Sequence, residues 1–219
     1  MGPGVRMVCT PSQDFRNLNY YKKLRKKIIL SLLVGLLLAA CQADNEYSTW
    51  PCRFAYDNGT HQDATLSSCM DVNVPGMFCL ITESVRGGVK YLNFKSNYNA
   101  TSSQIETEAE KRAEYILGLN NGIIVGFQNA VLDAFGNAVF VAYDMQCPNC
   151  VRQSGNTLSP TYGVSMSDKG IATCGKCGRK YDMNSGGILQ NGQEGDTGLE
   201  KYAAATSGPF GHLSVFRHR

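Results

Sequence analysis

The sequence predicts a mainly β fold, a small antiparallel barrel or meander with one helix and a metal-binding subdomain of two knuckle loops. Two observations support this prediction. Short runs rich in β-branched and aromatic residues alternate with turns that contain Gly and Asn along most of the chain. Two Cys-x-x-Cys pairs follow two of these runs, and each pair lies in a tight polar loop. The 219 residues suit one such domain with an appendage.

The appendage is N-terminal and is typical of an export signal. Residues 28–40 form a largely apolar run of thirteen residues behind a basic run at 22–27, too short to span a bilayer. The sequence LAAC, which ends at Cys41, resembles the bacterial lipobox, in which the cysteine is acylated and begins the mature lipoprotein. The resemblance implies a signal peptide over 1–41 and a lipid anchor that makes the membrane a partner. The alternative is a secretory signal with a chance cysteine.

Residues 42–49 are a short polar tether before a domain at 50–219. The sequence QADNE at 42–46 resembles the Gln-Ala-acidic signal that sends lipoproteins to the surface of some Gram-negative bacteria, with Asn45 in place of an acidic residue. The resemblance implies the bacterial cell envelope, at the outer membrane. It leaves open whether the domain occupies the periplasmic or the surface face.

The charge of the chain argues against nucleic acid as a partner. The formal net charge is +3, but residues 1–41 hold seven basic side chains and one acidic one. The remaining residues carry fourteen basic and seventeen acidic side chains, so their net charge is −3. Without a basic cluster, the domain has no electrostatic footprint for DNA or RNA.

Three cysteines at the start of the domain predict one disulfide and one free thiol in an oxidising compartment. Cys52 and Cys79 lie in strand-like runs that we expect to pair, PCRFAYD and MFCLITE, whereas Cys69 lies in a polar segment. The favoured disulfide therefore joins Cys52 to Cys79. The alternative, Cys52 to Cys69, stays open.

The next elements are a hairpin and the helix. Strand-like runs at 77–83 and 89–95 flank an Arg-Gly-Gly turn. Ser103, followed three residues later by Glu106, has the pattern of a capping box. Apolar residues from there to Leu117 recur at helical spacing. The sequence therefore predicts a helix that begins at Ser103.

The second half of the domain consists of short strands and loops. Runs at 122–127 and 138–144 lead to the first cysteine pair, and a hairpin of 162–166 with 170–173 leads to the second. We expect 151–160 to be a polar loop, the glycine-rich stretch at 186–198 to form turns, and 213–216 to be the last strand.

The two pairs predict a metal site. Cys147 and Cys150 are separated from Cys174 and Cys177 by twenty-three residues, and Pro or Gly within each loop favours a knuckle that aims two sulfurs at one point. Four thiolates form a tetrahedral cage that suits Zn(II) or a single iron. The alternative is a pair of local disulfides, which would be strained at so short a spacing.

The segment after the second pair resembles the second half of the Rieske iron–sulfur domain, which reads C-P-x-H-G-S-x-F-D, then T-G and G-P-A turns, then L-x-x-Y. Here the chain reads CGKCGRKYD from Cys174 to Asp182, then Ser-Gly, Asn-Gly and LEKY. The strands before the first pair also resemble those that precede the first loop of the family, C-x-H. The resemblance covers about 114–217 and implies an antiparallel β-sandwich or small barrel with a metal-binding subdomain at about 145–183.

The departures from that family concern the metal. Cys150 and Cys177 stand where the family has its two histidine ligands, Lys176 where some members have a bridging cysteine, and Arg179 where a serine hydrogen-bonds the cluster. The knuckles are more similar to those of rubredoxin and zinc ribbons, which favours one structural zinc ion. Alternatives are an electron carrier with a [2Fe-2S] or single-iron centre and a Cys-x-x-Cys thiol oxidoreductase.

Catalytic patterns are scarce in the sequence. His61, His212 and His218 lie away from the cysteine pairs and outside any recognisable nucleophile motif, so we expect surface residues. Four protein ligands would also leave zinc no open position for water or substrate. The sequence therefore favours a binding or assembly role over an enzyme. It does not specify a protein partner.

Overall fold

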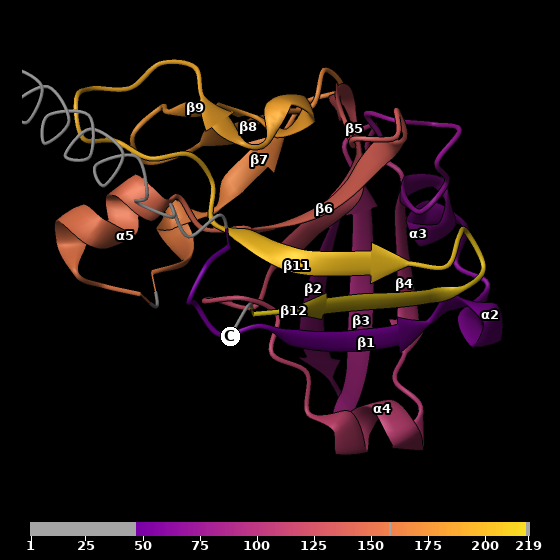
Figure 1. Cartoon of the computed structure of the whole chain (residues 1–219). Helices are drawn as coiled ribbons and strands as arrows, with labels where there is room; N and C mark the ends of the chain where they lie inside the picture. Colours follow the sequence, from indigo (N-terminus) through magenta and orange to yellow (C-terminus); the bar gives the residue numbers. More distant parts are fainter. Residues whose placement is uncertain (1–46, 158, 218–219) are drawn as a thin grey trace, which may run out of the picture. The chain divides into compact units, whose positions relative to one another are not determined.

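The computed structural model describes residues 47–157 and 159–217 (Figure 1). They form two antiparallel sheets, and the larger one curls into a half-barrel. The prediction of a mainly β, antiparallel fold is therefore confirmed. The predicted signal peptide, Cys41 and most of the tether lie outside the described residues.

The large sheet has eight strands in the order β1-β12-β11-β6-β5-β2-β3-β4. The small sheet has four, in the order β10-β9-β8-β7, and all of these come from the segment between β6 and β11. The large-sheet strands are β1 (Arg53–Asp57), β2 (Phe78–Arg86), β3 (Val89–Ser96), β4 (Thr101–Ile105), β5 (Ile123–Leu132), β6 (Ala138–Asp144), β11 (Lys201–Thr206) and β12 (His212–Phe216). The small-sheet strands are β7 (Val164–Met166), β8 (Ile171–Cys174), β9 (Lys180–Asp182) and β10 (Ile188–Leu189).

The first strand of the domain pairs with the last one. In the antiparallel register of β1 and β12, Phe54 lies opposite Val215 and Tyr56 opposite Leu213, and all four side chains are buried. The prediction that the run around Cys52 pairs with 77–83 is therefore wrong. Alternating apolar residues identify a strand and its buried face, but they do not specify its partner.

The predicted helix is shorter than expected and begins later. Residues 101–105 form β4, in which Ser103 lies opposite Asn93 of β3. Helix α4 (Glu108–Ala113) follows, and Thr107 and Glu110 make its capping box. Both Ser103 and Thr107 have a glutamate three residues later, and strand pairing with β3 leaves only the second position as a cap.

The other helices are short and were not predicted. α2 (Asn58–His61) and α3 (Ala64–Cys69) begin after Asp57 and Asp63, whose carboxylates accept backbone N–H groups. α5 (Pro148–Ser154) replaces the first half of the loop expected at 151–160, and the 3-10 turns η1 (Pro160–Tyr162) and η2 (Met183–Ser185) complete the set. Within 47–157 and 159–217, none of the helices is long and apolar enough to cross a membrane.

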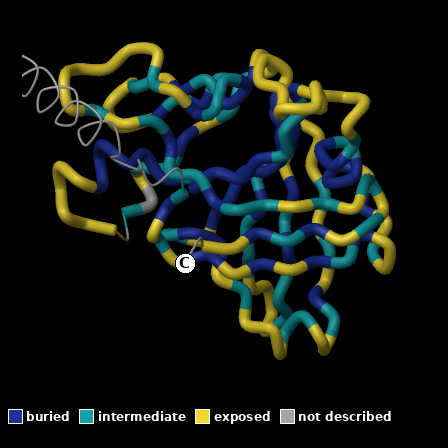
Figure 2. The backbone as a smooth tube through the Cα atoms, viewed as in Figure 1, coloured by how far each residue is buried: buried dark blue, intermediate teal, exposed yellow. Residues whose placement is uncertain are grey.

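Two clusters of buried side chains form the core. Figure 2 shows where the buried residues lie along the backbone. The first cluster consists mainly of residues from the large sheet and includes Phe54, Tyr56 and Leu92. The second includes Phe78 and Ile124 of the large sheet together with residues of the small one. Three of the four predicted metal ligands belong to this second cluster, so the small sheet and the cysteine loops share one apolar core with the large sheet.

The expected disulfide between Cys52 and Cys79 is not formed. The two residues and Cys69 are buried free cysteines. The thiol of Cys52 lies 3.9 Å from the carbonyl oxygen of Val215, while the side chain of Cys79 contacts Cys69. The prediction was wrong because it assumed that the strands of Cys52 and Cys79 are neighbours, whereas β1 and β2 are separated by four strands in the sheet.

Candidate metal centre

The four predicted ligands converge on one point. The sulfurs of Cys147, Cys150, Cys174 and Cys177 all lie within 4.8 Å of one another. Two contacts cross between the pairs: Cys147 Sγ lies 3.7 Å from Cys177 Sγ, and Cys150 Sγ lies 3.8 Å from Cys174 Sγ. This group of cysteines can hold a metal ion, as the sequence predicted.

The first knuckle is formed where β6 gives way to α5. Cys147 has extended backbone angles at the N-cap of α5, and Pro148 occupies the first turn of that helix, where a missing N–H costs nothing. The helix then turns Cys150 back toward Cys147. Both thiols are buried, with exposed fractions of 0% and 5%.

The second knuckle is the turn between β8 and β9. Cys174 is the last residue of β8, and its carbonyl accepts the N–H of Gly178, while its own N–H donates to the carbonyl of Arg179. Gly178 has a φ of +72°, a left-handed conformation that glycine adopts without strain. Cys177 lies at the tip of this turn and is exposed.

The residues at 162–164, which lead into strand β7, join the two knuckles. On one side the N–H of Cys147 donates to the carbonyl of Tyr162, and Gln146 bridges Gly163. On the other side Val164 lies opposite Cys174 in the small sheet. The backbone therefore fixes the distance between Cys147 and Cys174, so both buried ends of the site are preorganised.

Tyr181 and Asn149 support the sulfurs. The Tyr181 hydroxyl lies 2.9 Å from Cys147 Sγ and accepts a hydrogen bond from Asn149 Nδ2. The Asn149 side chain also bonds the backbone N–H and C=O of Thr197. Sequence reasoning did not assign either role. The position of the two residues in the sequence is the feature that indicates these roles, since Asn149 lies inside the first Cys-x-x-Cys loop and Tyr181 follows the second.

An ion pair closes the outer side of the second knuckle. Arg179 donates two hydrogen bonds, of 2.8 and 2.9 Å, to the carboxylate of Asp196, and both side chains are about nine-tenths buried. The loop 192–198 is thereby held against the turn that carries Cys177. The glycine-rich stretch thus contains the Asp196 that anchors Arg179, in addition to the turns that the sequence predicted.

The surroundings shift the pKa values of Cys150, Cys174 and Cys177, and not all in the same direction. Burial raises the pKa of Cys150 and of Cys174 above the ordinary thiol range. Partial burial also opposes ionisation of Cys177, but hydrogen bonds from the Arg179 backbone and side chain lower its pKa to about 7. A dication bound by the four sulfurs would stabilise all of them as thiolates.

The histidines lie elsewhere. The side chain of His61 is only 9% exposed, stacks on Tyr56 and lies 3.0 Å from the carboxylate of Glu110, so its expected surface position is corrected. His212 is exposed at the start of β12, and His218 lies outside the described residues. No histidine of the described residues joins the four-cysteine group.

No protein-family model, no curated protein and no solved structure matches this chain.

Proposed function

We propose that the chain holds one Zn(II) ion in a four-thiolate structural site, within a lipid-anchored protein of the bacterial cell envelope. The spacing of the sulfurs is the main observation in favour of a single ion. In a tetrahedral site with Zn–S bonds of about 2.3 Å, neighbouring sulfurs are about 3.8 Å apart. The two cross-pair contacts, at 3.7 and 3.8 Å, match this edge length.

The same spacing disfavours a two-iron cluster. In a [2Fe-2S] centre, two thiolates bind each iron, and the two irons with their bridging sulfides hold the thiolate pairs well apart. Here all four sulfurs lie within 4.8 Å of one another. The site would have to open to admit such a cluster, so one ion fits the residues better than the cluster that the Rieske resemblance implies.

A structural role follows from the surroundings of the site. Four protein ligands leave zinc no open coordination position, which a hydrolytic zinc needs. Cys147, Cys150 and Cys174 belong to the second core cluster, and Cys174 is the last residue of strand β8 in the small sheet. The ion would therefore link two loops that are far apart in the sequence and stabilise the small sheet against the large one.

A single-iron electron carrier is the second candidate. Two observations favour it: Cys177 is exposed at the tip of its turn, and the Tyr181 hydroxyl lies 2.9 Å from Cys147 Sγ. Hydrogen bonds to the sulfurs and solvent exposure are among the features that set the potential of an iron–thiolate centre. The same four-sulfur cage would serve either metal.

The sequence indicates no helix after either cysteine pair, which disfavours a thiol oxidoreductase, because its Cys-x-x-Cys motif normally opens a helix. That reason is wrong for the first pair, because α5 begins directly after Cys147. The sulfur contacts now provide a different reason. The contacts at 3.7 and 3.8 Å each join a cysteine of one pair to a cysteine of the other, which suits a shared ion better than a dithiol that closes on its own partner.

The envelope location and the Rieske relationship rest on sequence resemblance. The lipobox-like sequence at Cys41 supports the anchor. An inserted small sheet that presents two cysteine loops between β6 and β11 supports the relationship to the Rieske domain, whose two metal loops the sequence resembles. The proposed role is therefore binding or assembly at the envelope, with the metal holding the fold.

Metal analysis of the purified full chain tests the proposal. We expect one zinc per chain in colourless protein, and loss of that zinc in Cys147→Ser and in Cys174→Ser. Cys69→Ser is the matched control, since Cys69 is a buried cysteine outside the cage and its loss leaves the zinc in place. Coloured protein with one iron per chain would contradict the zinc site and support the single-iron electron carrier. Metal-free protein with a reducible disulfide within each pair would overturn both.

A further inference from the structure

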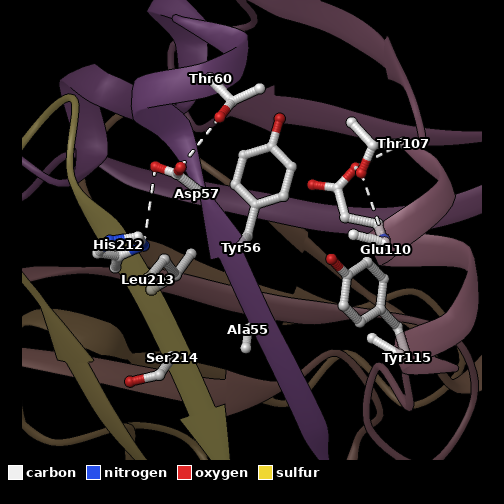
Figure 3. Close-up of a pocket in the computed structure, with 12 residues that line it drawn as sticks. Ala55, Tyr56, Asp57, Thr60, Thr107, Glu110, Tyr115, His212, Leu213 and Ser214 are labelled. Carbon is white, nitrogen blue, oxygen red and sulfur yellow. Dashed lines mark hydrogen bonds and ion pairs between the residues drawn. The ribbon is translucent and has the colours of Figure 1, made fainter.

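A second site lies on the opposite part of the domain, between the edge of the large sheet and α4. It is a groove of about 450 Å³ lined by residues of β1, β12, α2 and α4, together with Tyr115 (Figure 3). A volume of this size is within the range of small-molecule sites. The groove includes none of the four cysteines and is independent of the metal proposal.

One wall of the groove is an open strand edge. β1 is the first strand in the order of the large sheet, and only β12 pairs along it. Arg53 exchanges two backbone hydrogen bonds with Ile116 on its other side, which closes that end. Backbone groups in a strand alternate in direction, so the N–H and C=O of Ala55 point the same way as those of Arg53. They therefore face the groove, away from β12.

Two phenol groups at the groove have hydroxyls without a hydrogen-bond partner among the described residues, those of Tyr56 and Tyr115. Tyr56 is only 2% exposed. Figure 3 shows its ring between Asp57 and Glu110, and shows the Tyr115 hydroxyl directed toward that space. A buried hydroxyl without a partner costs free energy, so these oxygens are positions where a ligand can supply hydrogen bonds.

Two carboxylates and one histidine line the groove; the histidine, His212, has its Nδ1 3.7 Å from the Asp57 carboxylate, and Glu110 lies 3.0 Å from His61. Asp57 and Glu110 contribute carboxylates, and none of the described residues that line the groove is Lys or Arg. The Asp57 side chain is about half exposed, although its carboxylate caps α2. Burial and the negative charge of Glu110 both raise the pKa of Tyr56 and of Tyr115, so the phenols stay neutral. The groove thus offers acceptors and negative charge.

We propose that this groove binds a small organic cation with N–H donors, a primary ammonium or a guanidinium group on a short aliphatic chain. Its donors would bond the Asp57 carboxylate, the Ala55 carbonyl and the phenol oxygens, and its charge would face Glu110. The aliphatic part would lie on the alanine and leucine side chains that line the remainder of the groove. An anionic ligand would meet two carboxylates with no Lys or Arg among the lining residues, and His212 offsets that charge only when it is protonated.

Binding of agmatine to the purified full chain tests this inference, because agmatine carries a guanidinium and an ammonium on a four-carbon chain. Calorimetry or ligand-observed NMR should show saturable binding that weakens with added salt. We expect affinity to fall on the order of fivefold in Tyr115→Phe, which loses one hydrogen bond. It should fall on the order of tenfold in Asp57→Asn, which loses a charge-assisted one.

Both variants are chosen to keep the fold. Asparagine caps a helix as well as aspartate does, and phenylalanine keeps the edge contact of the Tyr115 ring with Phe54. Tyr98→Phe, at an exposed tyrosine outside the groove, is the matched control and should bind agmatine as the wild type does. Saturable binding that both groove variants weaken supports the inference. No binding to the wild type, equal binding of the dianion glutarate, or unchanged affinity in both groove variants overturns it.

Discussion

The hydroxyl of Tyr181 lies 2.9 Å from the sulfur of Cys147, and both groups are fully buried. Asn149 holds the tyrosine from the other side through a hydrogen bond of 3.1 Å. The metal cage therefore has a second layer, in which a residue of the first Cys-x-x-Cys loop positions a residue that follows the second. Such outer groups orient the ligands and tune their basicity.

Replacing Tyr181 by phenylalanine should weaken metal binding without removing it. The variant keeps the buried ring but loses the hydrogen bond to the sulfur, so we expect zinc affinity to fall roughly 10- to 100-fold. Competition with a chromogenic chelator measures it. Tyr143→Phe is the matched control, since its buried hydroxyl bonds Gln128 and the Met183 carbonyl instead of a sulfur. An equal loss in both variants would show that the effect comes from the core and not from the sulfur contact.

Removing the cap of α4 should destabilise the domain. Thr107→Ala loses the side-chain oxygen that accepts the N–H of Glu110, which should lower the free energy of unfolding by about 1 kcal/mol. Ser103→Ala, at the position that the sequence favours as the cap, should cost only a few tenths of a kcal/mol, because Ser103 is exposed and its hydroxyl makes a surface hydrogen bond to Asn93. Urea unfolding of both variants compares them. A larger loss for Ser103→Ala would contradict the observed start of the helix.

Glu106 should make stability depend on pH. Burial, and then the neighbouring Glu83, raise its pKa to about 7, so the folded state favours the protonated acid. The stability that protonation provides is complete below the ordinary glutamate pKa of about 4.3 and is lost as pH rises through 7. Glu106→Gln should therefore change the free energy of unfolding little at pH 4 and raise it by on the order of 1 kcal/mol above pH 7.

Thermal unfolding across this pH range measures the effect of Glu106→Gln. Glu108→Gln is the control, because the Glu108 side chain is 76% exposed and pairs with Lys111 on the surface. A stability difference between wild type and Glu106→Gln that stays constant from pH 4 to 8 would show that Glu106 does not titrate in this window.

Peptide mapping under non-reducing conditions should find no link between Cys52 and Cys79. The thiol of Cys52 contacts the Val215 carbonyl on β12, whereas Cys79 lies on β2 between β3 and β5. The chain should therefore be alkylated at both cysteines once it is unfolded without reductant. A disulfide-linked peptide that contains both residues would contradict the strand order of the large sheet.

The sequence predicted what depends on local pattern. The hairpin turn at 86–88, the strands before each cysteine pair and the convergence of Cys147, Cys150, Cys174 and Cys177 all follow from spacing and turn chemistry, and the structure places them as expected. The conformation of a Cys-x-x-Cys loop depends mainly on its own four residues, so the sequence pattern is enough to predict it.

What depends on distant contacts was predicted poorly. The pairing of β1 with β12 joins the two ends of the domain, and no local signal names that partner. The disulfide prediction failed for the same reason. Thr107 and Ser103 both satisfy the capping pattern, and the difference between them comes from the pairing of β4 with β3. Tyr181 was assigned no contact with Cys147 because thirty-three residues separate the two in sequence.

X-ray absorption at the metal edge of the purified full chain measures the ligand shell itself. The account predicts one zinc per chain, surrounded by four sulfurs at about 2.3 Å, with no second metal atom nearby. A shell with fewer than four sulfurs, or a metal–metal distance that reveals a two-iron cluster, would contradict it.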